Sequence, residues 1–258
     1  MTEPIDILHP SVAAMLKTMQ MVLGEFDVDY FLVGAVARDI GLSASEAFKA
    51  LRKTNDVDIA ILLDSEDRFY AIKEALLTTG EFKESAHKAI KLIYKEVIEV
   101  DLLPFGEIEN EERELQLSRH SLLVMDMSGF KEVYPFVEML QLAKDLSLNV
   151  CPLEGLVILK LIANDDNPSR TKDISDIEHL LKVYFELNSN EIYTHYMEVM
   201  DKYDTNINEY LQLVSARVIG RKMKTILLHE IATTEKIKLI LDKRPVASWQ
   251  AMLAGLND

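Results

Sequence analysis

Apolar residues follow two kinds of spacing along the chain, and the balance between them changes near residue 150. Residues 11–26 place apolar side chains three and four positions apart, which predicts a helix. Residues 57–63 form an almost continuous apolar run, which predicts a buried strand. Beyond Cys151 and Pro152 the spacing is helical, with little strand signal. The pattern therefore predicts an α/β (α+β) part over residues 1–150 and a mainly helical part over residues 151–258.

The same patterns predict the remaining elements. Residues 29–42 combine a short strand, a glycine turn at Gly34 and the start of a helix, and residues 107–115 form an acidic surface segment, as a loop or the edge of a helix. Further strands are expected at residues 89–94, 97–105, 136–143 and 146–150, and further helices at residues 65–80, 153–163 and 171–185.

Composition and charge narrow the class of protein. The 258 residues carry a net charge of −15, so the chain lacks the many lysines and arginines that a general nucleic-acid coat needs. Its single cysteine, Cys151, excludes an intrachain disulfide and fits a reducing compartment. The sequence shows neither a signal-peptide pattern nor an apolar run long enough to cross a membrane. We therefore expect a soluble cytoplasmic protein.

Two acids stand at the start of the apolar run at residues 57–63. Asp56 and Asp58 are two positions apart, so on a strand their side chains point to the same face. Like charges at that separation repel each other, and a bound divalent cation that prefers oxygen ligands, such as Mg²⁺, would relieve the repulsion. Taken alone, a helix cap or a solvated strand end explains the pair equally well.

A glycine turn before this pair and a third acid after it favour a nucleotide site. Gly34 lies between a predicted strand and a predicted helix, where small residues let a phosphate approach the N–H groups of the helix N-terminus. Asp101 lies on the predicted strand at residues 97–105, where a carboxylate is costly to bury unless it is paired or metal-bound. Alone, a glycine at Gly34 is more often just a tight turn, and Asp101 could be an exposed residue of an edge strand. The order of the three features favours the functional interpretation.

This order resembles the pattern of the nucleotidyltransferase superfamily, and more closely that of the AbiEii-type toxin nucleotidyltransferases of type IV toxin–antitoxin pairs. The resemblance covers about residues 28–182 and includes RKTNDVD at residues 52–58, Lys160 on an apolar helix, and SRTKDISDIEHL at residues 169–180. It implies a nucleotidyltransferase fold with a mixed central sheet. Where the family usually has a second Gly or Ser, this chain has Ala35, so backbone N–H groups without a hydroxyl must bind the phosphate.

The resemblance also implies a role for each residue of the set. Asp56, Asp58 and Asp101 would be the catalytic residues and would hold Mg²⁺, as two ions. The residues implied in nucleotide binding are Gly34, Ala35, Arg38, Arg52, Thr54, Lys160 and Asp173.

Simpler interpretations stay open for several of these side chains. Arg38 and Arg52 are equally explained as surface residues. The ammonium of Lys160 could extend from an apolar helix into water, and Asp173 could be a first-turn acid that the helix dipole favours. A basic helical stripe further along the chain either contacts an RNA backbone or forms a solvated face; it consists of Arg217, Arg221 and Lys224.

The resemblance implies Mg²⁺-dependent transfer of a nucleotide from a nucleoside triphosphate (NTP) to an acceptor. The leading hypothesis is a toxin that modifies tRNA or another cellular target and is opposed by an antitoxin protein. A second hypothesis keeps the chemistry and changes the acceptor to a small molecule such as an aminoglycoside, which the acidic charge suits. A third is a non-catalytic binding protein that retains the fold and the acids.

Overall fold

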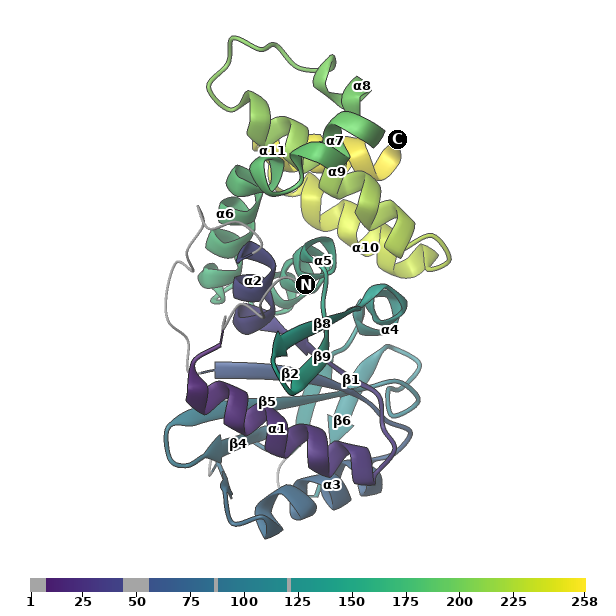
Figure 1. Ribbon diagram of the computed structural model, residues 1–258. Helices are drawn as coiled ribbons and strands as arrows, with labels where there is room; N and C mark the ends of the chain where they lie inside the picture. Colours follow the sequence, from purple (N-terminus) through teal and green to yellow (C-terminus); the bar gives the residue numbers. More distant parts are fainter. Residues whose placement is uncertain (1–7, 44–55, 86–87, 120–121) are drawn as a thin grey trace. The chain divides into compact units, whose positions relative to one another are not determined.

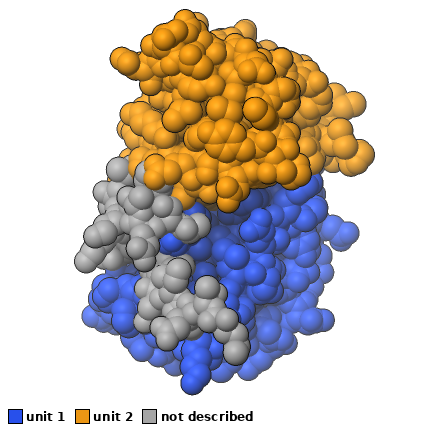
Figure 2. Space-filling view, turned by 45° about the horizontal axis from the view of Figure 1, so that its top comes forward, with its two compact units in different colours: residues 1–43, 49–152 blue, residues 44–48, 153–258 orange. Residues whose placement is uncertain are grey.

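The computed structural model describes residues 8–43, 56–85, 88–119 and 122–258 of the chain. By its internal contacts the chain divides into two units, shown in different colours in Figure 2. In the described ranges, unit 1 comprises the residues up to Pro152 and unit 2 comprises Leu153–Asp258.

Unit 1 is built on a mixed sheet whose seven strands lie in the order β3-β4-β5-β2-β1-β9-β8 (Figure 1). The pairs β2·β5 and β1·β9 are parallel, and the other neighbouring strands are antiparallel. The predicted mixed central sheet is therefore confirmed. The strands are β1 Tyr30–Val33, β2 Asp56–Leu62, β3 Phe82–Glu84, β4 Lys91–Tyr94, β5 Ile98–Phe105, β8 Glu138–Ala143 and β9 Leu146–Val150.

Strand β2 lies in the middle of this sheet because its side chains are apolar on both faces. Val57, Ile59, Ala60 and Ile61 are all fully buried. Burying a valine- or isoleucine-sized side chain contributes about 1.5–3 kcal/mol each, so the register of this strand is strongly held. The acids at its N-terminal end are thus attached to one of the best anchored segments of the unit.

Three longer helices complete unit 1: α1 Pro10–Glu25, α2 Gly34–Leu42 and α3 Glu66–Thr78. Helices α1 and α3 pack against each other on one face of the sheet, where α1 also contacts β9 and α3 contacts β3 (Figure 1). The buried residues of α1 have the predicted helical spacing; they are Val12, Met15, Leu16, Met19, Val22 and Leu23. Helix α2 follows β1 without a loop, as the glycine turn predicts.

The segment after β5 is largely the expected acidic surface loop, with Glu107, Glu111 and Glu112 exposed. It forms turns that lead into a small hairpin of β6 Glu114–Leu117 and β7 Leu123–Asp126, followed by α4 Phe130–Val133 and the 3₁₀ turn Tyr134–Phe136. Glu109, expected on the surface, has no exposed side-chain area. For Glu109 the expectation was wrong, because the sequence did not reveal the partners that make its burial favourable.

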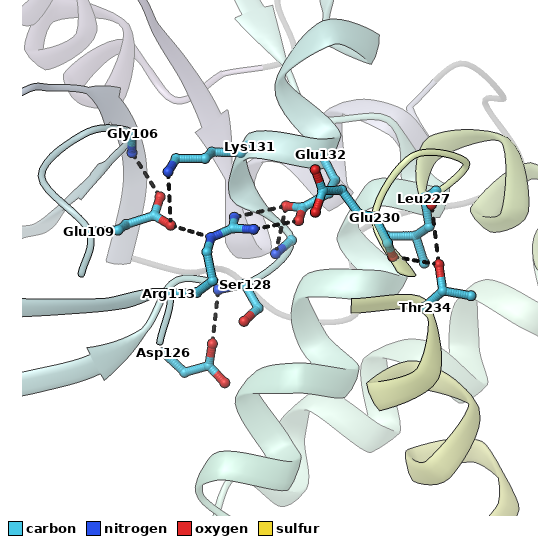
Figure 3. Close-up of polar contacts among 11 residues, drawn as sticks. Gly106, Glu109, Arg113, Asp126, Ser128, Lys131, Glu132, Leu227, Glu230 and Thr234 are labelled. Atoms are coloured by element: carbon cyan, nitrogen blue, oxygen red, sulfur yellow. Dashed lines mark hydrogen bonds and ion pairs between the residues drawn. The ribbon is translucent and has the colours of Figure 1, made fainter. Parts of the chain in front are cut away.

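Those partners form the network in Figure 3. Arg113 donates to Glu109 through Nε at 2.6 Å and to Glu132 through Nη1 at 2.8 Å. The backbone N–H groups of Gly106 and Gly129 donate to Glu109 and Glu132, at 2.8 Å and 3.0 Å respectively. Charge-assisted hydrogen bonds of this kind offset the cost of burying ionised groups. The network fixes the exit of β5 against α4.

Unit 2 consists of helices joined by turns over its described residues, as the spacing predicts. Its helices are α5 Leu153–Asp166, α6 Thr171–Leu187, α7 Ser189–His195, α8 Met197–Met200, α9 Tyr210–Ile226, α10 Ile231–Asp242 and α11 Ala247–Asn257. Helix α5 is buried on nearly all sides, which fits its almost uninterrupted apolar sequence. Helix α9 packs along α11 and also contacts α5 and α6. Within the described ranges, no helix has the length and apolar character that a membrane crossing requires.

Candidate active site

Asp56, Asp58 and Asp101 come together on one face of the sheet. Strands β2 and β5 are parallel neighbours, and their register places Asp58 beside Asp101 and Asp56 beside Glu99. Side chains at paired positions point to the same face, and residues two apart on one strand do so as well. The three predicted acids, with Glu99, therefore form one carboxylate cluster, hereafter the acid cluster.

Gly34 borders this cluster directly. Strand β1 pairs antiparallel with β2, with Val33 opposite Asp58, so the glycine turn begins beside the second acid. Gly34 has a φ of +67°, a left-handed conformation that favours glycine. A Cβ added at Gly34 would lie only 1.9 Å from Asp58 Oδ2. Both the backbone conformation of the turn and the position of the Asp58 carboxylate therefore require glycine here.

Helix α2 carries two further predicted residues. Ala35 lies in its first turn and is half-buried, next to the turn that borders Asp58. Arg38 is fully buried, and its Nη2 donates to Asp39 Oδ1 at 2.6 Å. The alternative in which Arg38 is a surface residue is therefore wrong. Its contact with a substrate phosphate stays a prediction, and Arg52 and Thr54 lie outside the described residues.

Lys91 is a residue of the cluster that the sequence analysis did not single out. It begins β4, and the antiparallel register places it opposite Asp101. Its Nζ lies 3.5 Å from Asp101 Oδ1 and 4.0 Å from Asp56 Oδ1, and it donates a hydrogen bond to Glu99. Pairing the strands predicted at residues 89–94 and 97–105 so that opposite charges face each other could have identified Lys91 from the sequence.

Burial and charge act in opposite directions within the cluster. Burial raises the pKa of Asp101, and the positive charges of Lys91 and Lys88 only partly offset this. For Lys91, burial disfavours the charge, but the hydrogen bond to Glu99 and the nearby carboxylates outweigh it, so the pKa of Lys91 is raised. The Asp101 carboxylate therefore has a higher proton affinity than an ordinary aspartate, while Lys91 stays protonated.

The donor chemistry of the cluster fits a hard divalent cation. All of its candidate ligands are carboxylate oxygens, which Mg²⁺ prefers. Asp101 Oδ1 is buried and accepts no hydrogen bond within the described part of the chain, although the Lys91 ammonium lies at ion-pair distance. In the same ranges, no three His, Cys, Asp or Glu side chains are already grouped around one metal position. A metal would thus require side-chain adjustment of acids that the backbone already places side by side.

Lys160 and Asp173 form a separate buried ion network within unit 2. Lys160 Nζ donates to Asp173 Oδ1 at 3.0 Å and to Asp176 Oδ2 at 2.8 Å, and Arg170 Nε donates to Asp173 at 2.7 Å. The Lys160 side chain is only 9% exposed, so the alternative in which its ammonium extends into water is wrong. Its anionic partners lie in its own chain, and contact with a nucleotide stays a prediction for both Lys160 and Asp173.

The basic stripe on α9 is largely paired with acids. Arg217 and Arg221 both donate to Asp258, at 2.9 Å and 2.6 Å through Nε. Directly after Arg221 and beside the stripe, Lys222 contacts Glu191 at 2.7 Å and Glu154 at 3.0 Å. These pairs neutralise most of the charge that an RNA backbone would need, so the stripe is not a ready phosphate-binding surface.

Comparison with known families and structures supplements this geometry. The family model described as "Nucleotidyl transferase AbiEii toxin, Type IV TA system" matches residues 45–258. No curated protein matches the sequence. Among solved structures of low similarity is the antibiotic-resistance factor ANT(2'')-Ia in solution, with 11% identity and a TM-score of 0.39 over 86% of this chain and 98% of that chain. The lincosamide antibiotic adenylyltransferase LnuA with bound lincomycin has 16% identity and a TM-score of 0.36 over 59% of this chain and 85% of that chain. The apo form II of a CCA-adding enzyme has 15% identity and a TM-score of 0.38 over 96% of this chain and 64% of that chain.

Proposed function

The chain belongs to the AbiEii family of nucleotidyl transferase toxins, and from this premise we propose that it transfers a nucleotide from an NTP to an acceptor at the acid cluster. Asp56, Asp58 and Asp101 hold Mg²⁺ in this proposal. The observation that carries it is the parallel register that sets Asp58 beside Asp101, with Gly34 directly against Asp58.

The reaction requires attack of an acceptor hydroxyl on the α-phosphorus of the NTP and loss of pyrophosphate. Two bound Mg²⁺ ions would stabilise the charge that develops on the attacking and leaving oxygens. Asp101 suits the role of base, because burial raises its pKa and thus its proton affinity. The N–H groups in the first turn of α2, which no side chain at its N-cap position bonds within the described residues, lie beside Asp58 and suit the remaining phosphates.

The family supplies the biological setting. It is described as the toxin of a type IV toxin–antitoxin system, so we propose that this chain is the toxin and that an antitoxin opposes it. An RNA acceptor, with tRNA as the leading hypothesis, requires a basic surface. The stripe on α9 does not supply one, because Arg217 and Arg221 are both paired with Asp258.

A second acceptor class is favoured by one observation, the net charge of −15. A negative surface attracts cationic molecules and repels polyanions such as RNA. A polycationic small molecule such as an aminoglycoside therefore fits the electrostatics better than RNA does, with the same chemistry at the acid cluster.

Transfer of radioactive label tests both acceptor classes together. The full chain is incubated with each of the four α-³²P-labelled NTPs and Mg²⁺, with total cellular RNA in one series and an aminoglycoside panel in the other. We expect label to move from one NTP to one acceptor class, and Asp58→Asn to abolish the transfer.

The matched control is Asp67→Asn, which removes one exposed carboxylate from its pair with Arg119 and should transfer like the wild type. Equal transfer by Asp58→Asn and Asp67→Asn would contradict the catalytic role of the cluster. Absence of transfer to either class, with NTP binding retained, would favour the non-catalytic binding protein.

A further inference from the structure

A positive charge already occupies the acid cluster. The Lys91 ammonium donates to Glu99 and lies 3.5 Å from Asp101 and 4.0 Å from Asp56. The Lys91 side chain is only 14% exposed, and the pairing of β4 with β5 fixes its backbone opposite Asp101. The ammonium is therefore held where it neutralises the same carboxylates that the proposed function assigns to metal.

Glu99 distinguishes this arrangement from a simple ion pair. It shares the face of the sheet with Asp56 and Asp101, but its side chain is half exposed at 47%, whereas that of Asp101 is 21% exposed. Lys91 makes its closest contact with Glu99 and its longer contacts with Asp101 and Asp56. The lysine can therefore give up the two aspartates and keep a charge partner, without leaving its strand.

We propose that Lys91 is a built-in counter-cation that stabilises the acid cluster without metal and yields Asp56 and Asp101 to a divalent ion, while it keeps Glu99. This inference rests on the metal site of the proposed function. A divalent cation near the ammonium is repelled by it, so Lys91 weakens the binding of metal alone. The negative charge of a triphosphate offsets that repulsion, so the site favours metal that arrives together with the nucleotide.

Manganese binding to the full chain tests the proposal without reference to activity. Free Mn²⁺ is followed by electron paramagnetic resonance during titration of the wild type, Lys91→Met and Lys91→Arg. We expect Lys91→Met to bind Mn²⁺ about tenfold more tightly than the wild type, because one nearby positive charge is gone. Lys91→Arg keeps the charge and should bind like the wild type.

Lys83→Met is the matched control for the loss of charge. Lys83 lies on the adjacent strand β3 and forms an exposed pair with Glu96, so its removal changes the net charge equally but leaves the cluster intact. We expect this variant to bind Mn²⁺ like the wild type. A structural role of Lys91 would weaken metal binding in Lys91→Met, so tighter binding is an outcome that such a role does not produce.

A second measurement uses the wild type only, and therefore does not depend on the folding of a variant. Lysine acetylation is mapped by mass spectrometry with and without saturating Mn²⁺. We expect the reactivity of Lys91 to rise on metal addition relative to that of Lys83, since its ammonium loses two of its three carboxylate partners. Unchanged or reduced reactivity of Lys91 would overturn the proposal.

Asp58→Asn separates the failure of this inference from that of the proposed function. If the wild type binds Mn²⁺, Asp58→Asn does not, and Lys91→Met binds no more tightly, the counter-cation is refuted and the metal site stands. If neither the wild type nor Lys91→Met binds Mn²⁺, both proposals fail. If Lys91→Met binds more tightly but no nucleotide is transferred, the role of Lys91 is supported and the proposed transfer fails.

Discussion

Replacing Gly34 by alanine tests whether the glycine turn serves the acid cluster or only the backbone. Gly34 has a φ of +67°, a conformation that costs a residue with a side chain about 1–2 kcal/mol. The new Cβ would also lie 1.9 Å from Asp58 Oδ2. Ordinary contact begins near 3.4 Å, so the Asp58 carboxylate would have to move by roughly 1.5 Å.

Gly80 provides a control that separates these two effects. Its φ is +74°, but among the described residues no neighbouring atom lies within 4 Å of a Cβ added there. Gly80→Ala therefore has the backbone strain without any contact with Asp58. We expect both variants to lose about 1–2 kcal/mol of unfolding free energy, measured by urea denaturation. The displaced carboxylate can rotate at small cost, so the clash should add little to the stability loss of Gly34→Ala.

We expect kcat/KM to differ strongly between Gly34→Ala and Gly80→Ala. A catalytic group misplaced by 1 Å or more reduces the rate by about 100-fold, so Gly34→Ala should lose about that factor in kcat/KM for nucleotide transfer. Gly80→Ala should retain the wild-type value at temperatures where it is folded. Equal kcat/KM values in the two variants would refute the reasoning, because the contact between Gly34 and Asp58 would then have no bearing on catalysis.

Three further predictions concern ion pairs, and each is measured as a free energy of unfolding in urea. Arg113→Met leaves two buried carboxylates without their main partner and should cost about 3–5 kcal/mol, whereas Arg119→Met, in an exposed pair, should cost at most about 1 kcal/mol. Lys160→Met removes the ammonium between two buried aspartates and should also cost about 3–5 kcal/mol. The hydrogen bond from Arg217 is the main cause that lowers the pKa of Asp258 from 3.8 to about 2, so this carboxylate stabilises the fold above pH 4. The stability advantage of the wild type over Asp258→Asn should therefore shrink as the pH falls from about 4 and be lost near pH 2; an advantage that does not change with pH would contradict the pairing.

The local elements could be predicted from the sequence because their signals are local. The apolar spacing of α1 and α5 and the apolar run of β2 each depend on neighbouring residues, and these predictions were confirmed. The proximity of Asp58 and Asp101 is different in kind. Their order along the chain indicated a common site, but their side-by-side position depends on the pairing of β2 with β5, which no local pattern of either strand specifies.

The contacts of charged side chains are even harder to predict from local sequence patterns. The sequence shows that Lys91 is the one charged residue of β4, but which acids it contacts depends on two strand pairings at once. The basic character of α9 was visible, whereas its pairing with Asp258 joins residues 41 and 37 positions apart. Composition thus predicts where charges occur, and tertiary structure decides whether they remain available to a ligand.

The strand order of unit 1 also determines when its sheet can be completed during synthesis. The segment from β2 to β5 can align the acids as soon as residue 105 has left the ribosome, because β3, β4 and β5 follow β2 in the chain. β1 pairs with β2 on one side, but on its other side it must wait for β9, whose pairing joins Leu32 to Val150. A nascent chain of intermediate length therefore exposes an open strand edge, and such edges promote aggregation. Translation that pauses before β9 emerges would yield a chain whose acids are aligned but whose sheet still needs protection, for example by a chaperone.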